Sequence, residues 1–205
     1  MPAGLIGSDP RLRALREALE SYGRNAQDPP IHGGDHQQAA VSVVIRSRDR
    51  LELLLIKRAQ SEHDPWSGHM ALPGGRREHS DSDLQHTARR ETLEETGVDL
   101  DRIGVPLGRL DDVAPSSPRL PRITISAFVF GVPANTEAKV ASAEVESVLW
   151  IPLDDLRNPE SHGTVEIPLP GGPRSFPTYD VVGEQVWGLT HRILEGFLWL
   201  YTESE

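Results

Sequence analysis

The sequence contains no cysteine, which excludes disulfide bonds, thiolate nucleophiles and zinc sites built on cysteine. It also lacks an apolar run long enough to cross a bilayer, and its N-terminal segment has no apolar stretch of the signal-peptide type. Lys and Arg number only 21 against 31 Asp and Glu, a formal net charge of −10, whereas nucleic-acid backbones are held by an excess of basic residues. We therefore expect a cytoplasmic protein that binds neither membranes nor nucleic acids.

The beginning of the chain predicts an amphipathic helix followed by a linker. Ser8-Asp9-Pro10 is typical of a helix start, and apolar side chains then recur at helical spacing at Leu12, Leu15, Leu19 and Tyr22. Residues 26–38 (AQDPPIHGGDHQQ) are polar and interrupted by Pro and Gly. We therefore divide the chain into an N-terminal helix and linker, residues 1–38, and a main domain, residues 39–205.

The main domain combines strand and helix patterns. Strands are expected at Val41–Arg46, Glu52–Arg58, Val105–Val113, Ile123–Phe130 and Val145–Ile151. Residues 157–178 are rich in Pro and Gly and indicate a long surface hairpin, and a last helix is expected at about Glu184–Tyr201. Strands on both sides of a central helix, with further helices outside, predict an α/β sandwich with a mixed sheet.

The central helix has recognisable ends. Ser82 can cap its first turn, and Gln85 can reciprocate in an S-x-x-Q capping box, so the helix should begin at Asp83. Gly97 in the left-handed conformation should end it.

Three glutamates on this helix form the most informative feature of the chain. Glu91, Glu94 and Glu95 share one face, and Arg90 stands four residues before Glu94. Like charges at these spacings cost a few tenths of a kcal/mol per pair. The glutamates also lie near the C-terminal end of the helix, where the dipole favours cations. A bound divalent cation would offset both penalties.

Magnesium is the ion that fits this donor set best. It prefers hard oxygen ligands and is typically bound by one or two carboxylates together with substrate phosphates. Such an ion neutralises phosphate charge and lowers the pKa of bound water. The alternative is a solvated acidic helix face without a ligand, because glutamate-rich helices are common.

The segment around these glutamates resembles the Nudix hydrolase family, whose box reads G-x5-E-x7-R-E-U-x-E-E-x-G-U, with U a bulky apolar residue. The second half of the box is present as residues 90–98, RETLEETGV, and Leu72-Pro73-Gly74-Gly75 matches the usual lead-in. Thr92 replaces an apolar residue. Asp81 replaces the first glutamate and is separated from Arg90 by eight residues instead of seven.

The resemblance implies a Nudix-type α/β/α sandwich and a magnesium-dependent enzyme, with manganese as a possible substitute. It would hydrolyse a nucleoside diphosphate linked to another moiety. Glu91, Glu94, Glu95 and the carbonyl of Gly75 would bind the metal, and Arg90 would orient the glutamates. A general base is also needed; the candidates are a box glutamate, such as Glu94, or a distant one, Glu144 or Glu146. The alternative for each distant glutamate is a solubilising position at a strand edge.

The choice of substrate is less closely constrained. Residues 53–58, 176–182 and 186–194 resemble the coenzyme A pyrophosphatase branch of the family, but Ala59 follows Arg58 and Gly68 precedes His69 where the branch has other residues. ADP-ribose or a nucleotide sugar is the alternative. Arg58 and Arg122 could bind phosphate oxygens, or could form surface ion pairs instead.

Two further questions stay open at the level of sequence. Trp66 and His69 could stack on a base or simply pack within their loop. A catalytically silent nucleotide sensor and a scaffold without nucleotide binding are alternatives to the enzyme, although a sensor need not keep the metal-binding residues. The resemblance also makes a homodimer possible.

Overall fold

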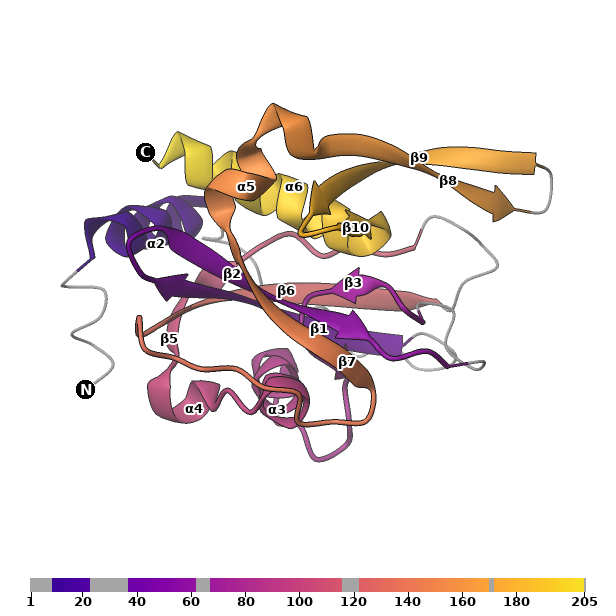
Figure 1. The fold of residues 1–205 in the computed structure, drawn as a ribbon. Coiled ribbons are helices and arrows are strands. Elements are labelled where there is room, and N and C mark those ends of the chain that lie inside the picture. The colour runs from indigo at the N-terminus through magenta and orange to yellow at the C-terminus, as the bar shows by residue number, and fades with distance from the viewer. Residues whose placement is uncertain (1–8, 23–36, 62–66, 116–121, 170–171, 205) are drawn as a thin grey trace.

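A computed structural model describes residues 9–22, 37–61, 67–115, 122–169 and 172–204 (Figure 1). Residues 26–36 of the expected linker, and Trp66, lie outside the described residues. Helix α2 spans Pro10–Tyr22, as the leucine spacing predicts.

A seven-stranded mixed sheet forms the centre of the molecule. Its main path is β3-β2-β1-β6-β5, with β4 paired to β1 and β7 paired to β2. The β1–β6 pair is parallel, while the other pairs in this sheet are antiparallel. The strands are β1 Gln37–Ser47, β2 Leu51–Arg58, β3 Met70–Ala71, β4 Gly74–Arg76, β5 Val105–Arg109, β6 Ile123–Val132 and β7 Val145–Pro152.

Helices cover both faces of this sheet. Helix α3 (Leu84–Thr96) and the short helix α4 (Leu100–Ile103) lie on one face, while α2 and α6 (Gly188–Glu203) lie on the other (Figure 1). Two apolar clusters correspond to these faces: a large one that includes residues of α2 and α6, and a smaller one that includes Leu84 and Ala88 of α3. The predicted α/β sandwich with a mixed sheet is confirmed.

The N-terminal helix α2 is built into the larger cluster. Leu12, Leu15 and Leu19 are at most 1% exposed, and Gly108 of β5 lies so close that a Cβ there would be 2.6 Å from the Cβ of Leu19. Strand β1 begins at Gln37, two residues before the expected start of the main domain.

A second, three-stranded sheet extends from the body of the protein. After α5 (Leu153–Arg157) and a 3-10 turn (Pro159–Ser161), β8 (His162–Leu169) and β9 (Gly172–Val181) form an antiparallel hairpin, which confirms the expected surface hairpin (Figure 1). Strand β10 (Glu184–Trp187) then pairs with β9.

Strand β10 corrects the expected last helix, which begins at Gly188 and not at Glu184. Val182 and Gly183 have φ values of 50° and 79°, the left-handed pair that favours a tight two-residue hairpin. The turn returns Glu184–Trp187 onto β9, and helical geometry starts only afterwards. The expected strand Val105–Val113 is also too long: β5 ends at Arg109, and Val113 forms an isolated bridge with Ile125.

The start of α3 needs a one-residue correction. The side chain of Asp83, not that of Ser82, caps the helix by accepting a hydrogen bond from the backbone N of His86 at 2.7 Å. Gln85 accepts from Arg89 at 3.0 Å, so the expected capping box is wrong. Aspartate is at least as good an N-cap as serine. The expected end is confirmed, because Gly97 is left-handed with φ 69° and its N donates to the carbonyl of Leu93.

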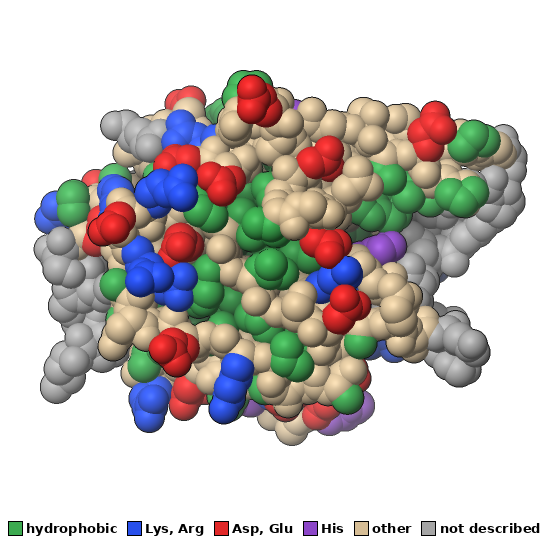
Figure 2. Space-filling model, in the orientation of Figure 1, with side chains coloured by type: hydrophobic (Ala, Val, Ile, Leu, Met, Phe, Trp, Pro, Cys, Tyr) green, Lys and Arg blue, Asp and Glu red, His purple; other side chains and the backbone are tan. Residues whose placement is uncertain are grey.

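The described surface agrees with the composition. Figure 2 shows acidic and basic side chains interspersed over the visible face, with no large basic patch there. Within the described residues, no helix combines the length and the apolar character that a membrane crossing needs.

Candidate active site

The two glycines that begin β4, Gly74 and Gly75, contact the glutamate face of α3. The backbone N of Gly74 donates a hydrogen bond of 2.9 Å to Oε2 of Glu95, whose residue is only 4% exposed. A Cβ on Gly75 would lie 2.4 Å from the carboxyl carbon of Glu91, closer than real side-chain contacts allow. Glycine at position 75 therefore lets the carboxylate of Glu91 lie directly against the backbone.

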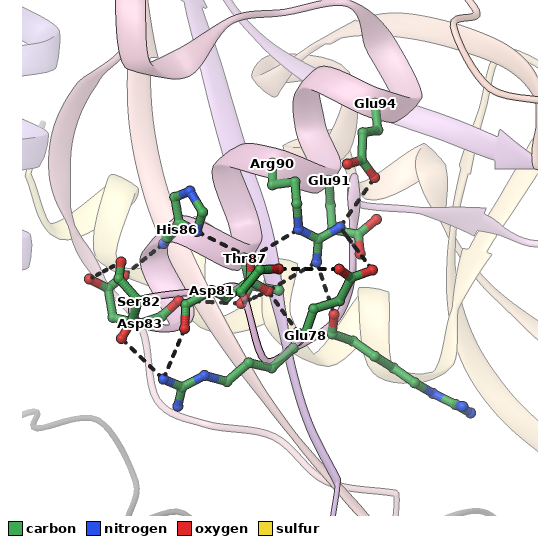
Figure 3. A network of polar contacts seen from close by, with 12 residues as sticks. Glu78, Asp81, Ser82, Asp83, His86, Thr87, Arg90, Glu91 and Glu94 are labelled. Carbon is green, nitrogen blue, oxygen red and sulfur yellow. Dashed lines mark hydrogen bonds and ion pairs between the residues drawn. The ribbon is translucent and has the colours of Figure 1, made fainter.

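Arg90 connects the carboxylates around this contact (Figure 3). Its Nε and Nη2 donate to the two oxygens of Asp81, each at 3.0 Å. Its Nη1 donates to Glu91 at 3.0 Å and to Glu94 at 3.1 Å, and Nη2 also reaches the carbonyl of Arg76 at 3.1 Å. One guanidinium thus ties the loop after β4 to the glutamate face of α3, in the bidentate geometry that favours arginine over lysine.

Asp81 holds Arg90 in place. Its side chain is fully buried, and it accepts hydrogen bonds from the backbone N of Glu78 at 2.8 Å and the hydroxyl of Thr87 at 2.9 Å, in addition to Arg90. Burial alone would raise the pKa of Asp81, but the hydrogen bonds from Arg90, Glu78 and Thr87 outweigh it and hold this pKa well below its ordinary value. Its oxygens are thus occupied by protein donors.

The two inner glutamates are shielded from water to different degrees, since Glu95 is buried and the side chain of Glu91 is 17% exposed. Burial raises the pKa of Glu95 to about 8; the N–H of Gly74 opposes this shift, and the negative charge of Glu91 adds to it. Burial also raises the pKa of Glu91, with Arg90 acting in the opposite direction. By contrast, the side chain of Glu94 is 55% exposed. A buried and a half-buried carboxylate side by side make a cation at this place favourable.

The distant glutamates differ in their surroundings. The charge of Glu144 contributes to the raised pKa of both Glu91 and Glu95, and its carbonyl accepts from the backbone N of Ala59, the residue after Arg58, at 2.8 Å. Glu146 forms an ion pair of 3.2 Å with Lys57 instead.

The two arginines predicted to bind phosphate lie in different surroundings. Arg58, at the end of β2, lies close enough to Glu95 that its charge lowers the pKa of that carboxyl. Arg122 is exposed just before β6, and its carbonyl accepts from the backbone N of Gln37 at 2.8 Å. His69 packs against Trp187, with ring centroids 4.7 Å apart, while Trp66, the other residue expected to stack on a base, is outside the described residues.

Thr92, which stands where the Nudix box usually has an apolar residue, has a polar partner on β1 across the contact between α3 and the sheet. It is fully buried, and its hydroxyl lies 2.8 Å from the hydroxyl of Ser42 on β1 and 2.7 Å from the carbonyl of Ala88. The neighbouring Leu93 is 45% exposed and so does not replace the missing apolar side chain. The serine–threonine pair fixes α3 against β1, and no local pattern in the sequence connects these two residues.

The oxygen atoms at this site suit a hard divalent cation, although the carboxylates of Glu91 and Glu95 now accept hydrogen bonds from protein groups. Among the described residues, no three His, Asp or Glu side chains already converge as a metal-binding group. Arg90 donates to Glu91, and the N of Gly74 donates to Glu95. Carboxylate and carbonyl oxygens are nevertheless what magnesium prefers. Because Gly75 has no side chain, its backbone lies directly against the carboxylate of Glu91.

The fold and the carboxylates of α3 define a class of α/β/α proteins in which an acidic helix face lies against two glycines of a strand. The profile of the NUDIX domain matches residues 36–168, which is more than half of the chain. The chain therefore belongs to the Nudix family, whose hydrolases act on pyrophosphate bonds. The predicted family is confirmed.

Individual relatives agree with this assignment. The chain is 28% identical to the Nudix hydrolase NudL of Yersinia enterocolitica, over 89% of this chain and 90% of that protein. It is 43% identical over 119 residues to the protein C14C4.10c of Schizosaccharomyces pombe, where the match covers 56% of this chain but only 36% of the yeast protein. A MutT/nudix family protein from Enterococcus faecalis, 20% identical with a TM-score of 0.52, has the same fold over 88% of this chain and 66% of its own.

Proposed function

We propose that the chain is a magnesium-dependent pyrophosphohydrolase that cleaves a nucleoside diphosphate linked to another moiety. The observation that carries this proposal is the packing of two carboxylates, buried Glu95 and half-buried Glu91, against Gly74 and Gly75 of β4. Buried, adjacent carboxylates are costly unless a cation joins them, and the family acts on pyrophosphate bonds.

The proposal gives each residue a distinct role. Glu91, Glu94, Glu95 and the carbonyl of Gly75 would hold magnesium, or manganese in its place. The ion supplies neutralisation of phosphate charge and a lowered pKa of bound water. Arg90 positions Glu91 and Glu94 through its hydrogen bonds. Arg58 and Arg122 are proposed to bind phosphate oxygens; the closeness of Arg58 to Glu95 makes it the stronger candidate.

Glu144 is the preferred distant general base. Its charge acts on both Glu91 and Glu95, whereas Glu146 is engaged by Lys57. A box glutamate such as Glu94 is the alternative. Glu144→Gln should lower kcat by about two orders of magnitude with little change in metal affinity, while Glu146→Gln should leave kcat within a factor of about two or three. Equal losses in both variants would contradict this choice.

The substrate is proposed to be a small nucleotide: a coenzyme A derivative, ADP-ribose or a nucleotide sugar. A panel of these compounds, assayed for phosphate-containing products with and without magnesium, tests the activity directly. Turnover that requires magnesium or manganese supports the proposal. Tight nucleotide binding without turnover of any compound would instead favour a sensor, and calorimetry without metal uptake, even beside nucleotide, would overturn the metal site.

Two further expectations concern the location of the protein in the cell and its oligomeric state. A cytoplasmic location agrees with the absence of cysteine. A homodimer is the other expectation, and Trp199 on α6, which is 58% exposed, is an apolar side chain that a subunit contact could cover. Sedimentation of the wild-type protein and of Trp199→Ala tests it, with a monomer in both as the contrary result.

A further inference from the structure

Arg77, the residue after β4, holds the loop that leads to α3. Its Nη2 donates to the carbonyls of Ser82 at 3.1 Å and Asp81 at 3.4 Å. Its Nη1 donates to Oε1 of Gln38 at 3.3 Å, and its backbone N donates to the carbonyl of Gln38 at 2.9 Å. Arg77 therefore ties the loop of residues 78–83 to the start of β1.

The shape of the Arg77 side chain matters here as much as its charge. Arg77 is half-buried, and the three groups that accept from its guanidinium are two backbone carbonyls and one amide oxygen. A guanidinium presents several donors in one rigid plane, whereas a lysine ammonium is a compact charge on a flexible stem. Lysine at this position would keep the charge but would not hold the three acceptors in the same way.

The loop that Arg77 holds carries the carboxylate that orients Arg90 (Figure 3). The two oxygens of Asp81 accept from Nε and Nη2 of Arg90, each at 3.0 Å. Nη1 of Arg90 then donates to Glu91 at 3.0 Å and to Glu94 at 3.1 Å. An unbroken series of hydrogen bonds thus leads from Arg77 to two of the proposed metal ligands.

The position of Asp81 depends on the loop and not on the helix. Asp81 lies three residues before Leu84, where α3 begins. Its backbone N donates to the carbonyl of Glu78 at 3.1 Å, and its own carbonyl accepts from Arg77. Because the side chain of Asp81 is fully buried, a shift of the loop would move its carboxylate relative to Arg90. Misplacement by about 1 Å, even by a change far from the chemistry, can cost roughly 10²-fold in rate.

We infer that Arg77 is a positioning residue of the candidate active site: it fixes the loop of residues 78–83, so that Asp81 orients Arg90 and, through it, Glu91 and Glu94. The inference rests on the proposed pyrophosphohydrolase function and deepens it. Arg77 stands at one of the variable positions of the Nudix box, so the motif itself assigns it no role.

Arg77→Lys separates the geometry of this side chain from its charge. We expect kcat to fall about ten-fold while KM stays within a factor of about two, and Arg77→Gln should behave in the same way. Steady-state kinetics at saturating magnesium, with the best substrate of the panel, measure both constants. Arg13→Lys is the matched control, because Arg13 is exposed on α2 at the other face of the sheet; it should leave kcat and KM unaltered.

Calorimetry with magnesium alone gives a readout that does not depend on turnover. Both Arg77 variants should bind the ion several-fold more weakly, because the glutamates are less firmly positioned, while Arg13→Lys should bind it as the wild type does. The loss of a positive charge in Arg77→Gln would by itself favour the cation. Weaker binding in that variant therefore reports on geometry.

A double-mutant cycle tests the path through Asp81. Asp81→Asn should lower kcat more than Arg77→Lys does, since Asp81 contacts Arg90 directly. Adding Arg77→Lys to Asp81→Asn should then cost less than about two-fold more. Urea denaturation checks the fold of each variant. If Asp81→Asn does not fold, Thr87→Val replaces it in the cycle, because it removes the hydroxyl that donates to Asp81 at 2.9 Å. Additive losses of kcat would overturn the inference.

The remaining outcomes separate the inference from the proposed function. Wild-type kcat and magnesium affinity in Arg77→Lys would overturn the inference and leave the pyrophosphohydrolase standing. A raised KM with unchanged kcat in Arg77→Gln, absent from Arg77→Lys, would do the same and make Arg77 a contact of substrate phosphate. If the wild type hydrolyses no compound of the panel, the proposed function falls, and calorimetry still decides whether Arg77 positions the glutamates. No magnesium uptake by the wild type would overturn both.

Discussion

Helices α2 and α3 have the same length but bury different kinds of side chain. Each has 13 residues, and each carries an Arg–Glu ion pair at i,i+4 spacing, Arg16–Glu20 in α2 and Arg90–Glu94 in α3. The residues that α2 buries are Leu12, Leu15 and Leu19, whereas α3 buries Leu84, Thr87, Ala88, Thr92, Glu95 and Thr96.

The difference shows that the two faces of the sheet have different roles: α2 on one face contributes stability, and α3 on the other positions charged groups. Each buried leucine of α2 contributes roughly 1.5–3 kcal/mol, so that helix stabilises the fold. The polar groups buried by α3 must find partners to avoid a penalty, as Thr92 does with Ser42 and Glu95 does with Gly74. A helix with such an interface adds less stability and holds charged groups in defined positions.

The sharpest way to test this division is to remove the same carboxylate from both helices. Glu94→Gln should lower turnover by about 10²- to 10⁴-fold, because Glu94 is a proposed metal ligand. Its side chain is 55% exposed, so the free energy of unfolding without metal should change by no more than about 0.5 kcal/mol. Steady-state kinetics and urea denaturation measure the two effects.

Glu20→Gln is the control, because it breaks the equivalent ion pair on α2. It should leave both turnover and stability close to wild type, as expected for an exposed pair. A clear loss of fold in Glu94→Gln would mean that the glutamate face of α3 is structural.

The opposite result is expected for the apolar helix. Leu15→Ala should lower the free energy of unfolding by about 2–5 kcal/mol, because Leu15 is completely buried in the larger cluster. The kcat of the folded fraction should stay within a factor of about two. Urea denaturation combined with assays at low temperature distinguishes the two quantities. A large drop in kcat without a loss of stability would contradict the division.

The start of α2 should contribute to the acid sensitivity of the protein. Hydrogen bonds from Arg11 and Ser47 outweigh burial and lower the pKa of Asp9 from 3.8 to about 2. Because the folded state lowers this pKa, its stabilising contribution of roughly 2 kcal/mol is complete above about pH 4 and is lost as the pH falls through 2. Unfolding free energies measured from pH 5 to pH 2 should fall less steeply for Asp9→Asn. Parallel curves would exclude Asp9 as a source of acid lability.

The smallest expected effect concerns the polar interface of α3. Thr92→Val and Ser42→Ala should each cost about 1 kcal/mol, and the double variant should cost about 0.5–1 kcal/mol less than the sum, because the hydroxyls are partners. A double-mutant cycle in urea measures this coupling. Strict additivity would show that the two hydroxyls act independently.

Periodicity and local signals predicted the elements whose partners are close in sequence. The leucine spacing gave α2, and Gly97 marked the end of α3 correctly. The start of α3 was misplaced by one residue because Ser82 and Asp83 are both good caps and only the folded loop selects between them. Glu184–Trp187 fits either helix or strand until β9 provides a pairing partner.

The candidate site was predictable only in its contiguous part. The glutamates and Arg90 lie within six residues, so their common face follows from helix geometry. The role of Asp81 depends on a loop that returns it to Arg90, and the pair of Ser42 and Thr92 joins residues 50 positions apart. The surface hollow lined by His69 on one side and by Asp180, Glu184 and Trp187 on the other is likewise assembled from two separate segments of the chain. Contacts of this kind arise from tertiary structure, which spacing does not encode.

The tight fit of Leu19 against Gly108 has a practical consequence for anyone shortening this protein. The segment that matches the NUDIX profile, residues 36–168, omits both α2 and α6. A fragment trimmed to those limits would uncover one whole side of its central sheet and present a bare apolar surface to water, which promotes aggregation. Expression of the catalytic region should therefore retain everything from Asp9 onward.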